Sequence, residues 1–164
     1  MSPLRDDDRR DLLILDTGPI RELILHHAVF DFRFEGLRRD LGWLTTPASY
    51  HRCSQFIASF KRKMTSASVV SELNNWIRKT EKHGRARLWR RAYDEFRNME
   101  MNEEVIPLAA MNIDMVTRFG PVDASLIELA RQHQPEYPLV LTVDSELSGQ
   151  CLNAGFRVRL LGEL

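Results

Sequence analysis

Near its start the chain carries the segment Leu12-Leu13-Ile14-Leu15-Asp16-Thr17-Gly18-Pro19. Four successive apolar residues are typical of a strand that is buried on both faces, as the strands of parallel sheets are. Gly18-Pro19 ends this strand, and the apolar residues that follow, at positions 20, 23 and 24, stand at helical spacing. The segment therefore predicts a buried parallel strand that carries Asp16 at its carboxyl end and leads into a helix.

The same alternation of strand and helix continues along the chain. Further strands are predicted at 63–66, 105–108, 139–143 and 156–161. Between them we expect mainly helical structure over 26–62, a helix after 66 that Ser66 or Ser68 caps, a basic amphipathic helix over 85–99, a helix that starts at Gly120-Pro121, and a helix over 145–153. Strands that alternate with helices indicate an α/β fold with a parallel sheet covered on both sides.

Four carboxylates are predicted to meet at one edge of this sheet. Asp16 and Asp144 follow predicted strands, and Glu72 and Asp123 lie in the early turns of helices. Ligands of open α/β sheets bind beyond the carboxyl ends of the strands, and the helix starts face the same edge. We therefore expect the four side chains to converge.

Converging carboxylates need a compensating charge. Two unit charges about 4 Å apart repel by roughly 4 kcal/mol at an effective dielectric constant of 20. Mg²⁺ or Mn²⁺, which prefer carboxylate and water ligands, remove this repulsion and can activate water against a phosphodiester. Each residue alone also has a structural interpretation: an exposed helix glutamate for Glu72, a first-turn stabiliser for Asp123 and a helix cap for Asp144. The functional interpretation rests on the four together.

Length and composition agree with one compact domain. The chain has 164 residues, of which 43% are hydrophobic and 28% charged, as in ordinary globular proteins. We expect a flexible tail over 1–10 and a single domain over 11–164. The sequence has no apolar run long enough to cross a membrane and no signal peptide, which favours a cytoplasmic protein with Cys53 and Cys151 as reduced thiols.

The net charge of zero conceals a strong asymmetry along the chain. Residues 61–97 carry 11 basic and 4 acidic side chains, whereas residues 98–164 carry 4 basic and 10 acidic ones. Four arginines of the predicted basic helix, Arg85, Arg87, Arg90 and Arg91, are candidates to hold RNA through its phosphates. The alternative is a solvated helix face without a ligand.

Four motifs, in order, resemble those of the PIN-domain family, in particular its VapC-like ribonuclease toxins. They are Leu15-Asp16-Thr17-Gly18-Pro19-Ile20, Thr65-Ser66-Ala67-Ser68-Val69-Val70-Ser71-Glu72-Leu73, Gly120-Pro121-Val122-Asp123-Ala124-Ser125-Leu126-Ile127 and Leu141-Thr142-Val143-Asp144-Ser145-Glu146-Leu147. Gly155-Phe156-Arg157-Val158 is similar to the closing strand of the family. The resemblance spans about residues 12–161.

The resemblance implies a three-layer α/β/α sandwich with a mostly parallel, Rossmann-like sheet. It implies an endoribonuclease that depends on Mg²⁺ or Mn²⁺, with Asp16, Glu72, Asp123 and Asp144 as the catalytic metal-site residues. Thr17, Thr142 and Glu146 would support them. The implied partners are an RNA substrate, a small antitoxin protein and a second copy of the chain in a homodimer.

Three other classes of protein compete with this interpretation. Aspartate phosphatases of the haloacid-dehalogenase type need a second aspartate two residues after the first, where this chain has Gly18. They and response-regulator receivers use a lysine late in the chain, and the last lysine here is Lys82. The non-enzymatic alternative is a catalytically inactive PIN-like module for RNA binding or assembly, although such degenerate members usually lose acidic residues.

Overall fold

A central all-parallel sheet organises the protein, whose computed structural model describes residues 10–80 and 84–164. Its strands are β1 (Leu12–Leu15), β2 (Arg62–Ser66), β3 (Met101–Glu104), β4 (Leu139–Thr142) and β5 (Arg157–Leu160), in the spatial order β3-β2-β1-β4-β5. The prediction of a parallel sheet is thereby confirmed. The predicted tail over 1–10 lies, except for Arg10, outside the described residues.

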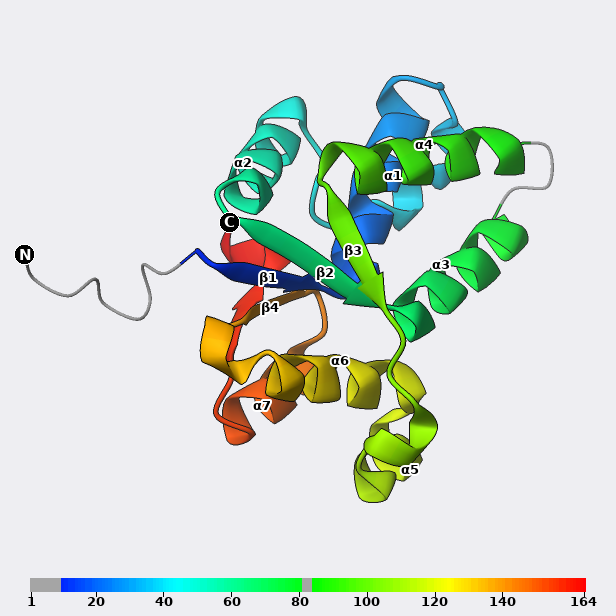
Figure 1. Ribbon diagram of the computed structural model, residues 1–164. Helices are drawn as coiled ribbons and strands as arrows, with labels where there is room; N and C mark the ends of the chain where they lie inside the picture. The colour runs from blue at the N-terminus through cyan, green and yellow to red at the C-terminus, as the bar shows by residue number, and fades with distance from the viewer. Residues whose placement is uncertain (1–9, 81–83) are drawn as a thin grey trace, which may run out of the picture.

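Helices cover both faces of the sheet. On one side lie α1 (Thr17–Phe30), α2 (Pro47–Ala58), α3 (Ala67–Thr80) and α4 (Arg85–Asn98), and on the other lie α5 (Ile113–Phe119), α6 (Pro121–Gln132) and α7 (Ser145–Asn153) (Figure 1). Short 3₁₀ helices are η2 (Glu35–Asp40), η3 (Leu108–Ala110), η4 (Gln134–Glu136) and η5 (Leu161–Glu163). The three-layer α/β/α sandwich is confirmed.

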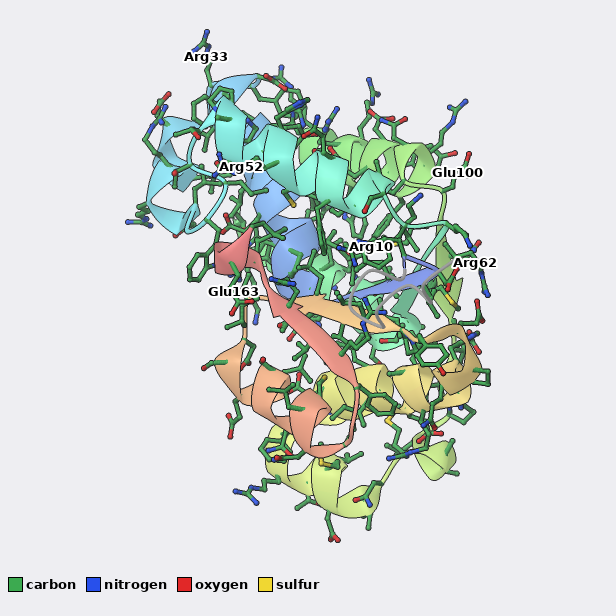
Figure 2. The ribbon with its side chains drawn as sticks, turned by 90° about the vertical axis from the view of Figure 1, so that its left-hand side faces the viewer. Arg10, Arg33, Arg52, Arg62, Glu100 and Glu163 are labelled. Carbon is green, nitrogen blue, oxygen red and sulfur yellow. The ribbon has the colours of Figure 1, made fainter. Side chains whose placement is uncertain are left out.

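The two central strands are buried throughout. Every residue of β1 and of β4 is buried, because helices cover the sheet on both sides and β1 and β4 each have a neighbouring strand at either edge. Charged side chains lie at the outside of the sandwich (Figure 2). Arg10 and Arg62 lie at the amino-terminal ends of β1 and β2. A strand that is buried on both faces has no polar positions, so a continuous apolar run correctly predicted β1 and β4.

The predicted strand at 105–108 is wrong. The strand of this region is β3, residues Met101–Glu104, and Val105 beyond it is 73% exposed. Strand β3 lies at the edge of the sheet and pairs only with β2, so it needs no apolar run. Helix α5, which follows, was not predicted at all.

The long stretch between β1 and β2 is mainly helical, as predicted, but its middle part is a short 3₁₀ helix and not an α-helix. Within the predicted helical stretch 26–62, residues Glu35–Asp40 form only the short 3₁₀ helix η2. Helix α2 begins at Pro47, because Thr46 accepts a hydrogen bond from Ser49 N and proline suits the first helical position.

Buried polar groups of α1 hold the segment that follows η2. The Glu22 carboxylate, 2% exposed, accepts hydrogen bonds from the backbone N–H groups of Gly42, Trp43 and Leu44 at 2.9, 2.8 and 3.0 Å. One turn further along α1, His26 Nδ1 lies 2.7 Å from the Leu44 carbonyl oxygen. These hydrogen bonds fix the segment against α1.

The helices of the described residues are all too short or too polar to span a lipid bilayer. Both cysteines are free and buried, as expected for reduced thiols.

Candidate active site

A cleft opens where the order of the strands reverses. The chain builds the sheet outward from β1 through β2 to β3 and then returns to the other side of β1 as β4. Such switch points form crevices at the carboxyl ends of the strands. The cleft has a volume of about 400 Å³, and its lining includes all four predicted carboxylates, Asp16, Glu72, Asp123 and Asp144. The structure thus brings together side chains that are up to 128 positions apart in the sequence, the separation between 16 and 144.

Asp16 is the most enclosed of the four carboxylates, with 7% of its surface exposed. Its Oδ1 accepts a hydrogen bond from Thr17 N at 2.6 Å, which caps α1, and its Oδ2 accepts one from Thr142 Oγ1 at 2.7 Å. Burial raises the pKa of Asp16, these two hydrogen bonds oppose the rise, and the charges of Glu72 and Asp144 add to it. The side chain is therefore held firmly in one orientation.

Two threonine hydroxyls connect the carboxylates, as the resemblance implied for Thr17 and Thr142. Thr142 Oγ1 donates to Asp16 and accepts from Asp144 N at 2.9 Å, so it joins the ends of β1 and β4. Thr17 Oγ1 donates to Glu72 Oε2, which joins the first turn of α1 to α3. Glu72 itself is exposed to solvent at the rim of the cleft.

Asp144 has a structural role in addition to its place in the cleft. Its Oδ1 accepts from Glu146 N at 2.7 Å and from Leu147 N at 3.2 Å, and it is the N-cap of α7. The capping interpretation of Asp144 is therefore confirmed, and it leaves Oδ2 without a hydrogen bond among the described residues. Glu146 is exposed and adds its negative charge to the field of the site.

Asp123 shows the electrostatic consequence of this convergence most clearly. It lies in the first turn of α6 and is half-buried. Burial, followed by repulsion from Asp16, Asp144, Glu72 and Glu146, raises the pKa of Asp123 to about 7. Without a cation, this carboxyl group is thus partly protonated at neutral pH.

Close packing explains why a glycine stands in the first motif. A Cβ atom on Gly18 would lie 2.3 Å from Val143 Cγ2, a short side chain in the loop that carries Asp144. Glycine therefore allows the first turn of α1 to approach the end of β4. A larger residue would push Asp16 and Asp144 apart.

Buried serines position the other two carboxylates. Ser66, at the end of β2, lies 2.7 Å from Ser125 through the two hydroxyl oxygens, and its Oγ also accepts from Val69 N in the first turn of α3. Of the two predicted caps, Ser66 and Ser68, it is Ser66 that accepts this hydrogen bond. The contact holds the first turn of α3 close to the first turn of α6, so Glu72 and Asp123 face the same cleft.

The cleft also contains residues that sequence reasoning missed. Arg21, Asn75, Trp76 and Lys79 line it beside the carboxylates. The Nε of Arg21 is buried and has no hydrogen-bond partner within the described part of the chain. The last three residues follow Glu72 at intervals of three, four and seven positions, which places them on one face of a helix. That spacing was visible in the sequence.

The arginines of the basic helix lie elsewhere. Arg85, Arg87 and Arg90 are exposed on α4, and none of them lines the cleft. Arg91 is half-buried and donates a hydrogen bond to the buried Glu95 at 2.5 Å. Its guanidinium group is thus engaged within the protein, and the other three remain available to a ligand.

The donor set of the cleft fits a hard divalent cation that keeps part of its water. Among the described residues, no three acidic, histidine or cysteine side chains form a ready-made metal cage. Mg²⁺ does not need one, because it is usually bound by one or two carboxylates, several waters and substrate phosphates. Burial raises the pKa of Asp123 most, and the repulsion from the other carboxylates that adds to the rise is the charge imbalance that such a cation relieves.

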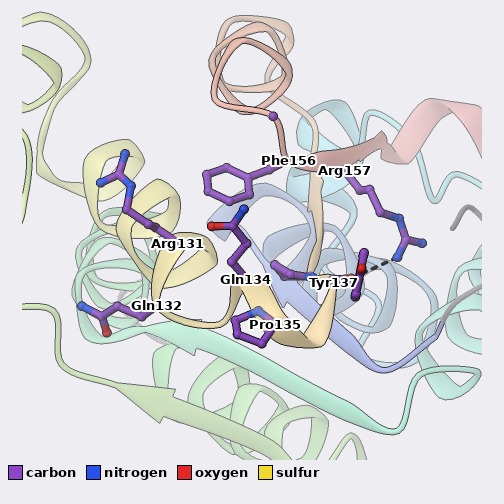
Figure 3. A pocket seen from close by; sticks show the side chains of 9 residues that line it. Arg131, Gln132, Gln134, Pro135, Tyr137, Phe156 and Arg157 are labelled. Carbon is purple, nitrogen blue, oxygen red and sulfur yellow. Dashed lines mark hydrogen bonds between the residues drawn. The ribbon is translucent and has the colours of Figure 1, made fainter.

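A larger hollow, of about 590 Å³, lies at the amino-terminal ends of the strands, opposite the acidic cleft (Figure 3). Its lining residues stand before or at the start of β4 and β5, and they include Arg131, Tyr137 and Arg157 but no carboxylate. The Arg157 guanidinium donates a hydrogen bond to the Tyr137 carbonyl oxygen at 3.0 Å. This hollow therefore lacks the chemistry found at the carboxyl ends of the strands.

The acidic cleft is thus the site at which four repelling carboxylates, of which Asp16 is buried and Asp123 half-buried, occur together with an arginine nitrogen that is unpaired among the described residues. No protein-family model matches this chain, and no curated protein is significantly similar to it.

Proposed function

We propose that this protein is a divalent-metal-dependent endoribonuclease of the PIN-domain type, which hydrolyses RNA phosphodiester bonds in the cytoplasm. The observation that carries the proposal is the convergence of Asp16, Glu72, Asp123 and Asp144 in one cleft, where burial and then repulsion raise the pKa of Asp123 to about 7. Raised carboxyl pKa values with a specific electrostatic cause are typical of functional sites. The order of the four motifs along the chain supports the same assignment.

Each residue of the cleft has a role in this proposal. Asp16, Glu72, Asp123 and Asp144 hold Mg²⁺ or Mn²⁺, and Thr17 and Thr142 fix the orientation of Glu72 and Asp16 through their hydroxyl groups. When bound, the cation supplies Lewis acidity, which favours deprotonation of water and neutralises charge on the phosphodiester.

Arg21 suits the phosphate of the substrate. Its Nε is buried, has no partner in the described residues and lines the same cleft as the carboxylates. An arginine presents N–H donors in a fixed fork that matches phosphate oxygens. We assign Arg21 to hold the scissile phosphate and to stabilise the charge that develops on it.

Metal-dependent cleavage is the first test. The purified protein should cut single-stranded or structured RNA in the presence of Mn²⁺ or Mg²⁺ and should stop when chelator is in excess. DNA of the same sequence serves as the control for the substrate class. Equal cleavage in excess chelator contradicts the metal mechanism, and RNA binding without cleavage under any metal condition favours the inactive binding module.

The exposed arginines of α4 are proposed to contribute to RNA binding. Replacing Arg85, Arg87 and Arg90 together with alanine should weaken binding and lower the slope of log Kd against log salt by about 0.7 for each phosphate that the variant no longer neutralises. The matched control replaces Arg52, Arg118 and Arg159, which are also exposed but lie on other elements. An unchanged slope in the α4 variant would mean that these arginines form a solvated helix face and do not bind RNA.

The biological role that we propose, the toxin of a toxin–antitoxin pair, rests on the sequence resemblance. A small antitoxin and a homodimer belong to the same proposal. A short reading frame directly upstream that encodes a small protein with a DNA-binding N-terminal region would support this role. Co-expression of that protein should suppress RNA cleavage by this protein.

A further inference from the structure

We infer that single-stranded RNA leaves the acidic cleft along α3, and that Trp76, Lys79 and Arg39 form a binding subsite for the nucleotide next to the scissile phosphate. This inference rests on the proposed function for the position of the scissile phosphate. It adds the path by which the RNA strand leaves the cleft. It also gives the segment between β1 and β2, which contains Arg39, a role in RNA binding.

The first observation is a stripe of side chains on α3. The helix buries Val69, Leu73 and Ile77 against the core. On an adjacent face, Asn75, Trp76 and Lys79 line the cleft together with Glu72. Glu72 and Lys79 are about 10 Å apart along the helix axis, at 1.5 Å per residue. The stripe therefore leads from the carboxylates to a cation at the far end of the cleft.

The second observation is a neighbouring hollow that shares a lining residue, Lys79, with the cleft. This hollow, of about 350 Å³, is lined by residues of η2 and by the end of α3, among them Leu37, Arg39, Lys79 and Thr80. Lys79 lines both spaces and so stands at their junction. Within residues 10–80 and 84–164, no ion pair of Lys79 with an acidic side chain is found.

The far wall of the hollow continues into a segment that is held in place. Segment 35–40 is followed by residues 42–44, whose N–H groups the buried Glu22 carboxylate binds. His26 holds the Leu44 carbonyl from the same helix. Arg39 is 87% exposed, and its Nε lies 3.9 Å from Asp40, a separation at which an exposed pair contributes little.

The chemistry of these residues suits one nucleotide of a single strand. The half-buried indole of Trp76 offers an aromatic face on which a base can stack, and stacking tolerates any base. Lys79 and Arg39 offer positive charge to the phosphates on either side of that base. The Asn75 amide lies between the carboxylates and Trp76 on the helix, where it can bond a base edge.

A paired strand fits this arrangement poorly. Trp76 lies within the lining of the cleft, so a base must leave its helical stack to reach it. Bases of single strands do so readily, whereas bases in a duplex are stacked and paired. The subsite is therefore assigned to single-stranded RNA.

The test measures binding of a single-stranded RNA octamer in excess chelator, followed by tryptophan fluorescence and by a label on the RNA. Trp76→Ala should weaken binding about tenfold, the usual size of one stacking interaction. Trp76→Phe keeps a ring against the core, so it should fold and bind nearly as the parent does but lose the quenching of fluorescence. Trp43→Phe, the matched control at a 47% exposed tryptophan, should keep both binding and quenching.

Salt dependence tests the two cations. Lys79→Ala and Arg39→Ala should each lower the slope of log Kd against log salt by about 0.7, the value for one phosphate of a single strand. Lys61→Ala and Arg52→Ala, which remove exposed cations away from the cleft, should leave the slope unchanged. A duplex of the same sequence should bind without quenching Trp76.

The outcomes separate this inference from the proposed function. Quenching that persists in Trp76→Phe, or unchanged slopes in both Lys79→Ala and Arg39→Ala, overturns the subsite even if the protein cleaves RNA with metal. Binding that depends on Trp76, Lys79 and Arg39 supports the subsite. If the protein then fails to cleave with any metal, the nuclease proposal is wrong and the subsite belongs to a binding module.

Discussion

Asp123→Asn is expected to reduce metal-dependent RNA cleavage by about a hundred- to a thousandfold, the loss that follows when one group that stabilises transition-state charge, such as an oxyanion-hole donor, is removed. The substitution keeps the shape of the side chain but removes a charge that Asp16, Asp144, Glu72 and Glu146 all repel. The protein should therefore remain folded while its site binds the cation less well. Cleavage rates at saturating Mn²⁺, together with circular dichroism of the variant, measure both effects.

Asp114→Asn is the matched control for this experiment. Asp114 lies in the first turn of α5, as Asp123 lies in the first turn of α6, but it is exposed and does not line the cleft. Cleavage by Asp114→Asn should equal that of the parent. Parent-like cleavage by Asp123→Asn would instead remove Asp123 from the catalytic site.

Addition of Mg²⁺ or Mn²⁺ is expected to raise the melting temperature of the parent by about 5–10 °C. A ligand at one hundred times its Kd stabilises the native state by about 2.7 kcal/mol, and each kcal/mol corresponds to about 2–4 °C in a protein of this size. The Asp123→Asn and Asp144→Asn variants should lose most of this gain. Asparagine caps helices about as well as aspartate, so a weakened α7 cap does not confuse the result for Asp144.

The same melts in excess chelator should depend on pH in a defined direction. Folding raises the pKa of Asp123 from 3.8 to about 7, so the folded state binds more protons than the unfolded state between these values. The contribution of Asp123 to stability therefore falls as pH rises from about 4 to 7. Asp123→Asn should stabilise the metal-free protein above pH 7 and make no difference below about pH 4.

A structural role for the acidic cluster predicts the opposite pattern. If metal leaves the melting temperature of the parent unchanged and Asp16→Asn lowers it, the nuclease proposal gives way to the binding module. Asp114→Asn again serves as the control, since it should alter neither the response to metal nor the dependence on pH.

The sequence alone was sufficient for the parts of the fold whose signal is local. The unbroken apolar runs of β1 and β4 predicted buried parallel strands, because a strand covered on both faces has no polar positions. Carboxylates placed after strands or in the first turns of helices predicted the acidic cleft, because parallel strands and the helices after them share one direction. This reasoning located Asp16, Glu72, Asp123 and Asp144 from their positions along the chain.

The sequence was misleading where pairing, rather than composition, defines an element. Strand β3 has the sequence Met101-Asn102-Glu103-Glu104 and exists because its backbone pairs with β2 at the edge of the sheet. The apolar residues after it suggested a strand in the wrong place. Helix α5 is likewise stabilised beside α6 and carries no buried residue of its own.

Only the tertiary structure decided which cations belong to the site. The sequence placed the excess of positive charge over residues 61–97 and favoured the arginines of the basic helix, but charge counted along the chain does not show which surface faces the carboxylates. Folding placed Arg21 and Lys79 in the cleft and engaged Arg91 with Glu95. It also placed Arg39 and Lys79 in the lining of one hollow, next to a segment, residues 42–44, that Glu22 holds by three hydrogen bonds. The direction of a strand or helix is encoded locally, whereas the meeting of distant segments depends on packing across the whole molecule.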